Sequence, residues 1–345
     1  MIMIPYMLDT SFNRVAMFDD FISFIWSSRF YECGDFELVV PVSEKALTYL
    51  KADNYICRED DENTGIIEDI KISRLEDGQE RMIISGRFLG SILERRIVSA
   101  QTTLTGTVSS CLNTLINDNI CYPQQSSRKI SNFRFESFYM TQTMNAQYTG
   151  KNLLNIITDV CKTYGVGFKV RLLNGLFIFS IYDGLDRTYD QNDRLPVVFS
   201  DVYDNLLGFD YEECYKNQVT AVLVAGEGEG QSRKMAWATD GTEGLLRREA
   251  FKEEKNISSN NGAISIPEYI ALLEESGKES ITQYTTAFTG QVYFDDIKYG
   301  TDVKLGDICV IQNKRWNLSV NARLVEVVES VSETGAYTIT PTFGV

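Results

Sequence analysis

Short apolar runs, many of them alternating with polar positions, dominate the first hundred residues. They are rich in β-forming residues, and turn residues such as Asp77-Gly78 separate them, which is typical of consecutive hairpins. The clearest runs are "ECGDFELVVPV" (32–42), "GIIEDIKISRL" (65–75) and "ERMIISG" (80–86). A short helix is expected at about 43–50, with Ser43 as its N-cap. The pattern predicts a mostly β domain, a β-barrel, in residues 1–100.

The hydrophobic period changes to that of a helix after residue 100. Apolar residues recur at helical spacing in "TGTVSSCLNTLINDNI" (105–120) and again in "GKNLLNIITDVCKTYGVGF" (150–168). Asn174-Gly175 then separates two strand-like runs, and this dipeptide is preferred in two-residue type I′ hairpin turns. Residues 101–200 are therefore predicted to form an inserted α+β module.

Strand-like runs return from about residue 201. A Ser/Asn/Gly-rich connector at 256–263 interrupts them, and Pro267 opens a helical stretch near 267–285. Residues 201–345 are predicted to be a C-terminal β-barrel domain that carries this helix. The expected fold class is mainly β: two β-barrel domains with an inserted α+β module.

The stretch "AVLVAGEGEGQSRKMAWA" (221–238) contains a glycine-rich loop, and two interpretations compete for it. A dinucleotide site needs G-x-G-x-x-G at the start of a helix. Here Gly226, Gly228 and Gly230 are spaced one residue too tightly, acidic spacers separate them, and strand-like alternation follows. We therefore predict a hairpin whose glycines supply positive φ angles at the turn, and no nucleotide or other cofactor.

Composition narrows the chemistry further. The 345 residues include no histidine, which excludes histidine-based triads, metal sites and proton shuttles. Seven scattered cysteines form no C-x-x-C pair, so no metal site is expected. The acidic turn at 58–65 lacks the register of a calcium loop. No signal peptide and no membrane-spanning segment are expected. The net charge of −15 disfavours binding to nucleic acid.

Several stretches, in the same order along nearly the whole chain, resemble the siphophage tail-hub proteins, also called tail-associated or baseplate hub proteins. They are "FISFIWSSRFYECGDFELVVP" (21–41), "GIIEDIKI" (65–72), "SILERRI" (91–97), "YKNQVTAVLVAGEGEGQSR" (215–233), "LLRREAF" (245–251), "PEYIALLEESGKESI" (267–281) and "LGDICVIQ…ARLVEVVESV…YTITPTFG" (305–344). The resemblance is weakest in residues 101–150.

The resemblance implies a structural, non-enzymatic protein with a fold like the central hub of contractile-tail baseplates. Such hubs are homotrimers at the distal tail tip of the virion, made in the host cytoplasm. The implied partners are the distal tail protein ring, the tape-measure protein and tail-fibre or receptor-binding proteins. The ring would close the tail tube and gate the genome DNA, which would pass through without specific binding.

Candidate interface residues come from residue type and from the family segments. Trp26, Trp237 and Trp316 are candidate anchors, because tryptophan is enriched at interface hot spots, although core packing is the competing interpretation for Trp26. Arg95 and Arg96 match a family segment and could bridge neighbouring chains or form salt bridges within one chain. Two other functions stay open: a cell-wall glycan hydrolase with a carboxylate pair, and a host-carbohydrate-binding module.

Overall fold

The computed structural model describes residues 3–76, 78–282, 285–292 and 297–344. The chain is mainly β, which confirms the predicted fold class. The helices in these ranges are α1 (Glu44–Tyr49), α2 (Val108–Ile116), α3 (Leu153–Tyr164) and α4 (Ile266–Lys278), with short helical turns η1 (Leu89–Arg95), η2 (Asn117–Cys121), η3 (Ser126–Arg128), η4 (Gly230–Ser232) and η5 (Gly244–Leu246).

Within the described ranges the strands fall into four sheets. They are β1 (Pro5–Leu8), β2 (Arg14–Met17), β3 (Ser23–Arg29), β4 (Asp35–Pro41), β5 (Tyr55–Arg58), β6 (Thr64–Arg74), β7 (Glu80–Phe88), β8 (Thr102–Thr107), β9 (Phe133–Glu136), β10 (Thr143–Tyr148), β11 (Gly167–Leu173), β12 (Leu176–Tyr182), β13 (Val198–Ser200), β14 (Leu206–Cys214), β15 (Ala221–Ala225), β16 (Met235–Thr239), β17 (Glu249–Glu253), β18 (Thr285–Val292), β19 (Ile308–Asn313), β20 (Leu318–Ser332) and β21 (Tyr337–Gly344).

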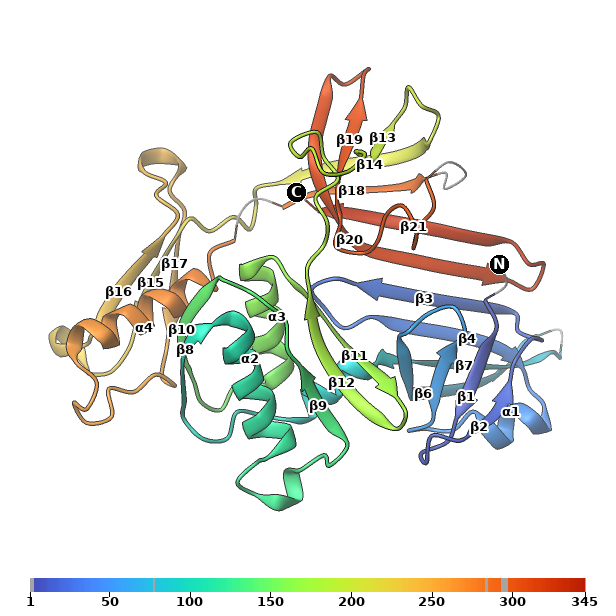
Figure 1. The fold of residues 1–345 in the computed structure, drawn as a ribbon, viewed down its shortest axis with the longest axis horizontal. Coiled ribbons are helices and arrows are strands. Elements are labelled where there is room, and N and C mark those ends of the chain that lie inside the picture. The colour runs from blue at the N-terminus through green and yellow to red at the C-terminus, as the bar shows by residue number, and fades with distance from the viewer. Residues whose placement is uncertain (1–2, 77, 283–284, 293–296, 345) are drawn as a thin grey trace.

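The two predicted β regions are joined as halves of one thirteen-stranded sheet. Its order is β14-β18-β21-β20-β3-β4-β7-β6-β5-β1-β2, with β13 and β19 attached through β20. The halves meet where β3 runs antiparallel to β20, from Arg29 opposite Glu326 to Ser23 opposite Ser332. Figure 1 shows the N-terminal half beside the C-terminal half along this seam. Among the described residues these pairings form an open order, without a bond from either end back to the other.

Large aromatic side chains fill the core of the N-terminal half. The alternation in β3 sends Phe24 and Trp26 inward, where both are completely buried. Trp26 packs against Phe88 with ring centroids 4.5 Å apart, and Phe36 from β4 lies 6.0 Å from it. The predicted short helix is confirmed as α1, and Ser43 caps it by accepting a bond from the backbone N–H of Ala46 at 3.1 Å.

The insert packs α2 and α3 against the β8–β10 pair and the β9, β11 and β12 sheet. The predicted hairpin turn is confirmed, since Leu173 pairs with Leu176 and Asn174 and Gly175 have φ angles of 50° and 74°. Gly165 ends α3 in the left-handed conformation, with φ 69°. The apolar positions chosen for their helical spacing, such as Val108 and Leu115, are buried in this core.

Residues 219–282 build a small module that projects from the rest of the chain at one end of the long axis (Figure 1). It consists of α4 and the sheet β16-β15-β17. Ser265 caps α4 in a capping box with Glu268, and Pro267 lies in its first turn. The helix ends at Lys278, earlier than the stretch near 267–285 suggested. The division into three domains at residues 100 and 200 stays a prediction. The buried hydrophobic residues of the described ranges form four clusters, one more than the number of predicted domains.

Candidate interaction surfaces

The glycine-rich loop connects β15 to β16, which are antiparallel neighbours. The backbone N–H of Gly226 donates to the Lys234 carbonyl at 2.9 Å, which closes the loop at its base. Gly228 and Gly230 have φ angles of 95° and 53°, in the region that favours glycine. The single helical turn η4 follows, and then β16. The glycine-rich dinucleotide motif places the phosphates at the N-terminus of a helix, and this loop leads into a strand instead.

Gly226 does not adopt a positive φ angle, so that prediction is wrong for this glycine. It is required for a different reason, because α4 passes directly over it. A Cβ atom at this position would lie 2.3 Å from the hydroxyl oxygen of Tyr269. That hydroxyl accepts a bond from the backbone N–H of Glu227 at 2.8 Å and donates to the Ile257 carbonyl at 3.3 Å. The buried Tyr269 side chain therefore fastens the glycine loop to the helix.

The small-module sheet has one covered and one uncovered face. Small residues, among them Val224 and Ala238, are buried beneath α4. Alternation along the strands sends large residues to the opposite face. Leu223 pairs with both Trp237 and Phe251, so these three side chains form one row across the three strands. Trp237 and Phe251 are 43% and 59% exposed.

A loop beside this row adds two more apolar side chains. Leu245 and Leu246 in η5 are 99% and 71% exposed. The guanidinium of Arg247 stacks over the indole of Trp237, with its carbon 4.9 Å from the ring centroid, which keeps the loop next to the row. We call the residues Met235, Trp237, Leu245, Leu246 and Phe251 the Trp237 face. Patches of this kind on monomers mark interaction sites.

The other candidate residues lie elsewhere. Trp26 is in the core of the N-terminal half, away from the surface of the chain. Trp316 is 55% exposed in the β19–β20 turn. Arg95 lies 3.9 Å from Asp53, and both are largely exposed. The guanidinium of Arg96 donates to the backbone carbonyls of Arg95 and Arg128. The structure brings none of these four together with Trp237 among the contacts of the described residues.

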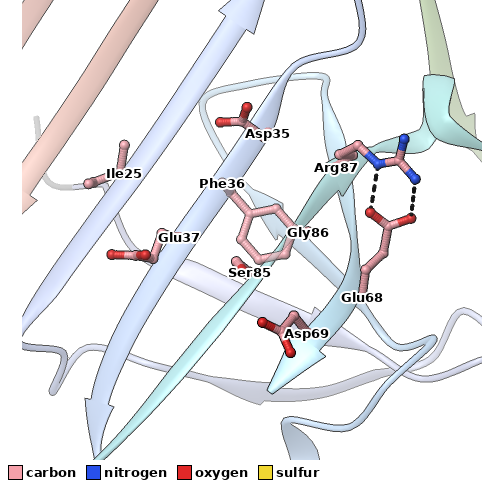
Figure 2. A pocket seen from close by; sticks show the side chains of 9 residues that line it. All are labelled: Ile25, Asp35, Phe36, Glu37, Glu68, Asp69, Ser85, Gly86 and Arg87. Carbon is pink, nitrogen blue, oxygen red and sulfur yellow. Dashed lines mark hydrogen bonds and ion pairs between the residues drawn. The ribbon is translucent and has the colours of Figure 1, made fainter. Parts of the chain in front are cut away.

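The outer face of the N-terminal half is hollowed into a groove of about 480 Å³ with a carboxylate-rich lining. Figure 2 shows Asp35, Glu37, Glu68 and Asp69 around it, with Arg87 as the lining cation. Arg87 forms a paired contact with Glu68 at 2.8 and 3.0 Å, and Asp35 pairs with an arginine outside the groove at 2.6 Å. Net negative charge remains, so this acidic groove repels anions at close range.

A buried ion cluster ties the two halves of the large sheet together. Arg58 from β5 pairs with Glu329 from β20 at 2.9 Å and with Asp60 at 2.6 Å. The hydroxyl of Tyr337 donates to the same Glu329 carboxylate at 2.6 Å. Burial raises the pKa of the neighbouring Asp61, and the nearby Glu329 charge adds to this shift. Removing one member of such a pair costs about 3–5 kcal/mol, because the partner charge stays buried.

This cluster borders a cleft of about 1090 Å³ between both halves and the β11–β12 hairpin. Acidic and basic side chains line it, and Lys169 and Arg171 of the hairpin pair with Glu62. Within the described ranges no group of three or more Cys, Asp or Glu residues is placed to hold a metal ion. No helix in the same ranges is long and apolar enough to cross a membrane.

Comparison with solved structures identifies the fold. A tail protein from Neisseria meningitidis aligns with a TM-score of 0.59 at 13% identity, over 99% of this chain and 96% of that chain. Prophage tail protein gp18 from Listeria monocytogenes aligns with a TM-score of 0.56 at 13% identity, over 99% and 94%. A chain of the Francisella PdpA–VgrG complex aligns with a TM-score of 0.51 at 11% identity, over 99% and 52%.

At these identities the likeness shows the fold alone, and no curated protein matches the sequence. A family model, however, matches residues 4–345, and its description is "Siphovirus ReqiPepy6 Gp37-like protein". This match confirms the resemblance to siphovirus tail proteins. Solved phage tail proteins and a chain of the PdpA–VgrG complex share the fold. The chain belongs to the Siphovirus ReqiPepy6 Gp37-like protein family.

Proposed function

We propose that this chain is the tail hub of a long-tailed phage, a homotrimeric ring that closes the distal end of the tail tube. The observation that carries the proposal is the family match over residues 4–345 together with a tail-protein fold over almost the full length of both aligned chains. Likeness to a chain from a VgrG complex supports a hub position. A structural role, without catalysis, agrees with the family.

The proposed partners follow from this position at the tail tip of the virion. The distal tail protein ring and the tape-measure protein contact the hub from the tube side. Tail-fibre or receptor-binding proteins attach on the outside. The exposed Trp237 face offers an apolar surface of the kind that such an assembly needs.

DNA passage is the second part of the proposal. The chain carries a net charge of −15, and the acidic groove adds a concentrated patch on the N-terminal half. Carboxylates along a channel wall offer no Lys or Arg side chains that could replace the counterions of the DNA phosphates. The genome can therefore pass without being bound. We infer that the acidic groove borders the channel.

The test is the assembly state of the purified chain. Light scattering should give a mass near three times 39.1 kDa, alone or with the distal tail protein, and electron micrographs should show rings with an axial hole. A chain that stays monomeric and never joins tails would contradict the proposal. Degradation of host cell wall, or tight binding to its polysaccharides, would favour the hydrolase or carbohydrate-binding alternatives instead.

A further inference from the structure

The charge around the Trp237 face differs from that of the whole chain. Residues 233–255, which contain the face, carry six Lys or Arg against five Asp or Glu, a net charge of +1 in a chain of −15. A second copy can therefore approach this surface without the repulsion that the rest of the chain exerts. The face needs a cover that combines apolar side chains with negative charge.

The loops on either side of β13 provide both. In residues 186–204 four apolar or aromatic side chains point to solvent, with Tyr189, Leu195, Val202 and Tyr203 between 57% and 86% exposed. The same segment contains five aspartates and two arginines, which gives it a net charge of −3. We call this segment the β13 loops.

The β13 loops are held in place from several sides. The side-chain oxygen of Gln191 accepts bonds from the backbone N–H groups of Asp193 and Arg194 at 2.9 and 3.0 Å. Asn321 on β20 donates to Asp190 at 2.8 Å, and the backbone N–H of Lys314 donates to the Asp201 carboxylate at 3.1 Å. Because the loops are tied down, they lose little conformational entropy when a partner binds.

We propose that the Trp237 face of one copy binds the β13 loops of the next copy. The inference rests on the proposed function, because it names the surfaces through which hub copies meet. The two surfaces lie on different modules, the Trp237 face on the small module and the β13 loops in the C-terminal half (Figure 1). Contact between two different surfaces is heterologous. It generates a closed ring when the rotations that relate each copy to the next add up to a full turn. Opposite local charges give the contact its register.

The first experiment measures self-association of the full chain by analytical ultracentrifugation. A face variant carries Trp237→Ser with Phe251→Ser. The protein concentration at which half of its chains are associated should be at least about tenfold higher than for the unmodified chain. A loop variant, Leu195→Ser with Tyr203→Ser, should show the same increase. The control Tyr139→Ser removes an aromatic side chain that is 87% exposed on the insert, and it should leave association unchanged. Thermal melting of the monomer checks that each variant is folded.

Mixing separates the proposed contact from any other. The face variant keeps its β13 loops and the loop variant keeps its Trp237 face, so the equimolar mixture should form a heterodimer while each variant alone stays monomeric. A mixture that stays monomeric would overturn the proposal. A loop variant that associates as well as the unmodified chain would do so too, because the Trp237 face would then pair with itself or bind elsewhere.

Charge reversal gives an independent measurement. Lys234→Glu with Arg248→Glu should weaken association, and Asp190→Lys with Asp193→Lys in the same chain should restore it. If rings form normally with every variant, this inference fails while the hub proposal stands. If the unmodified chain forms no rings, even with the distal tail protein, the hub proposal itself fails. Binding of the monomer to phosphatidylglycerol vesicles that is lost in Leu245→Ser with Leu246→Ser would overturn the inference in favour of a lipid surface.

Discussion

The N-terminal half of the large sheet and the sheet of the small module place their aromatic side chains on opposite sides. In the N-terminal half, Trp26 and its aromatic neighbours are buried, and carboxylates line the outer groove. In the small module, alanine and valine lie beneath α4 while Trp237 and Phe251 face solvent. The aromatic side chains of the N-terminal half therefore stabilise the fold of the chain itself, whereas those of the small module are exposed where a partner could contact them.

The largest expected effect tests this contrast with one substitution at two tryptophans. Trp26→Ala should lower the free energy of unfolding by about 3–5 kcal/mol, because it leaves a cavity among Phe36 and Phe88. Trp237→Ala should lower it by less than about 1 kcal/mol in the monomer, since the indole is 43% exposed and the change removes a surface contact with Arg247. Urea denaturation measures both. Equal losses would mean that Trp237 serves the fold of its own chain.

The second effect concerns why the small module uses small residues beneath its helix. Gly277 in α4 lies so close to the sheet that an added Cβ would come within 2.6 Å of the Ala238 Cβ and 2.8 Å of a Val224 methyl. Gly277→Ala should therefore cost about 1–3 kcal/mol through overpacking, despite the better helix propensity of alanine. Denaturation monitored by tryptophan fluorescence checks this. A stabilised variant would show that α4 can move away from the sheet.

Local features of the fold could be predicted from the sequence alone. The cap at Ser43, the helix start around Pro267 and the turn at Asn174-Gly175 depend on neighbouring residues, and the structure contains all of them. The parallel pairing of β15 with β17 joins residues far apart in the chain, so hairpin spacing could not reveal it.

The candidate surface was predictable only in part. Trp237 was identified by residue type, but Leu245, Leu246 and Phe251 were missed, because exposure depends on which face α4 covers. One signal was present: "MAWAT" alternates large residues with alanine, and the alanines mark the face on which a helix packs closely. In "FISFIWSSRF" large residues occupy both registers, so the position of Trp26 could not be decided from its neighbours.

A smaller effect sharpens the contrast between buried and exposed acids within the N-terminal half. Burial raises the pKa of Asp61, so the folded state binds its proton more tightly than the unfolded state does. Arg58 and Glu329 face this carboxyl, and Asn63 donates to it. Stability should therefore fall as the pH rises above the unfolded pKa of about 3.9, until the folded pKa is passed.

Asp61→Asn removes that titration, so it should raise the melting temperature at pH 7, and the gain should shrink towards pH 4. The matched change Glu37→Gln, at an exposed acid of the groove, should show no such pH dependence. Melting curves from pH 4 to pH 7 measure both variants. A melting temperature of Asp61→Asn that lies below the unmodified chain at pH 7 would show that the attraction of Arg58 outweighs burial.

The smallest expected effect on stability belongs to the acidic groove, and there the readout is DNA. Glu37→Gln with Asp69→Asn removes two charges that lie on the outer face, so the free energy of unfolding should change by less than about 0.5 kcal/mol. At low salt, assembled hubs of the variant should retain more duplex DNA than hubs of the unmodified chain. This difference should shrink towards 0.15 M salt, where charges more than about 8 Å apart are screened from each other. The control Glu229→Gln with Glu243→Gln removes the same charge from exposed positions of the small module. If the control increases DNA retention as much as the groove variant does, the net charge of the chain is responsible and the groove does not border the channel.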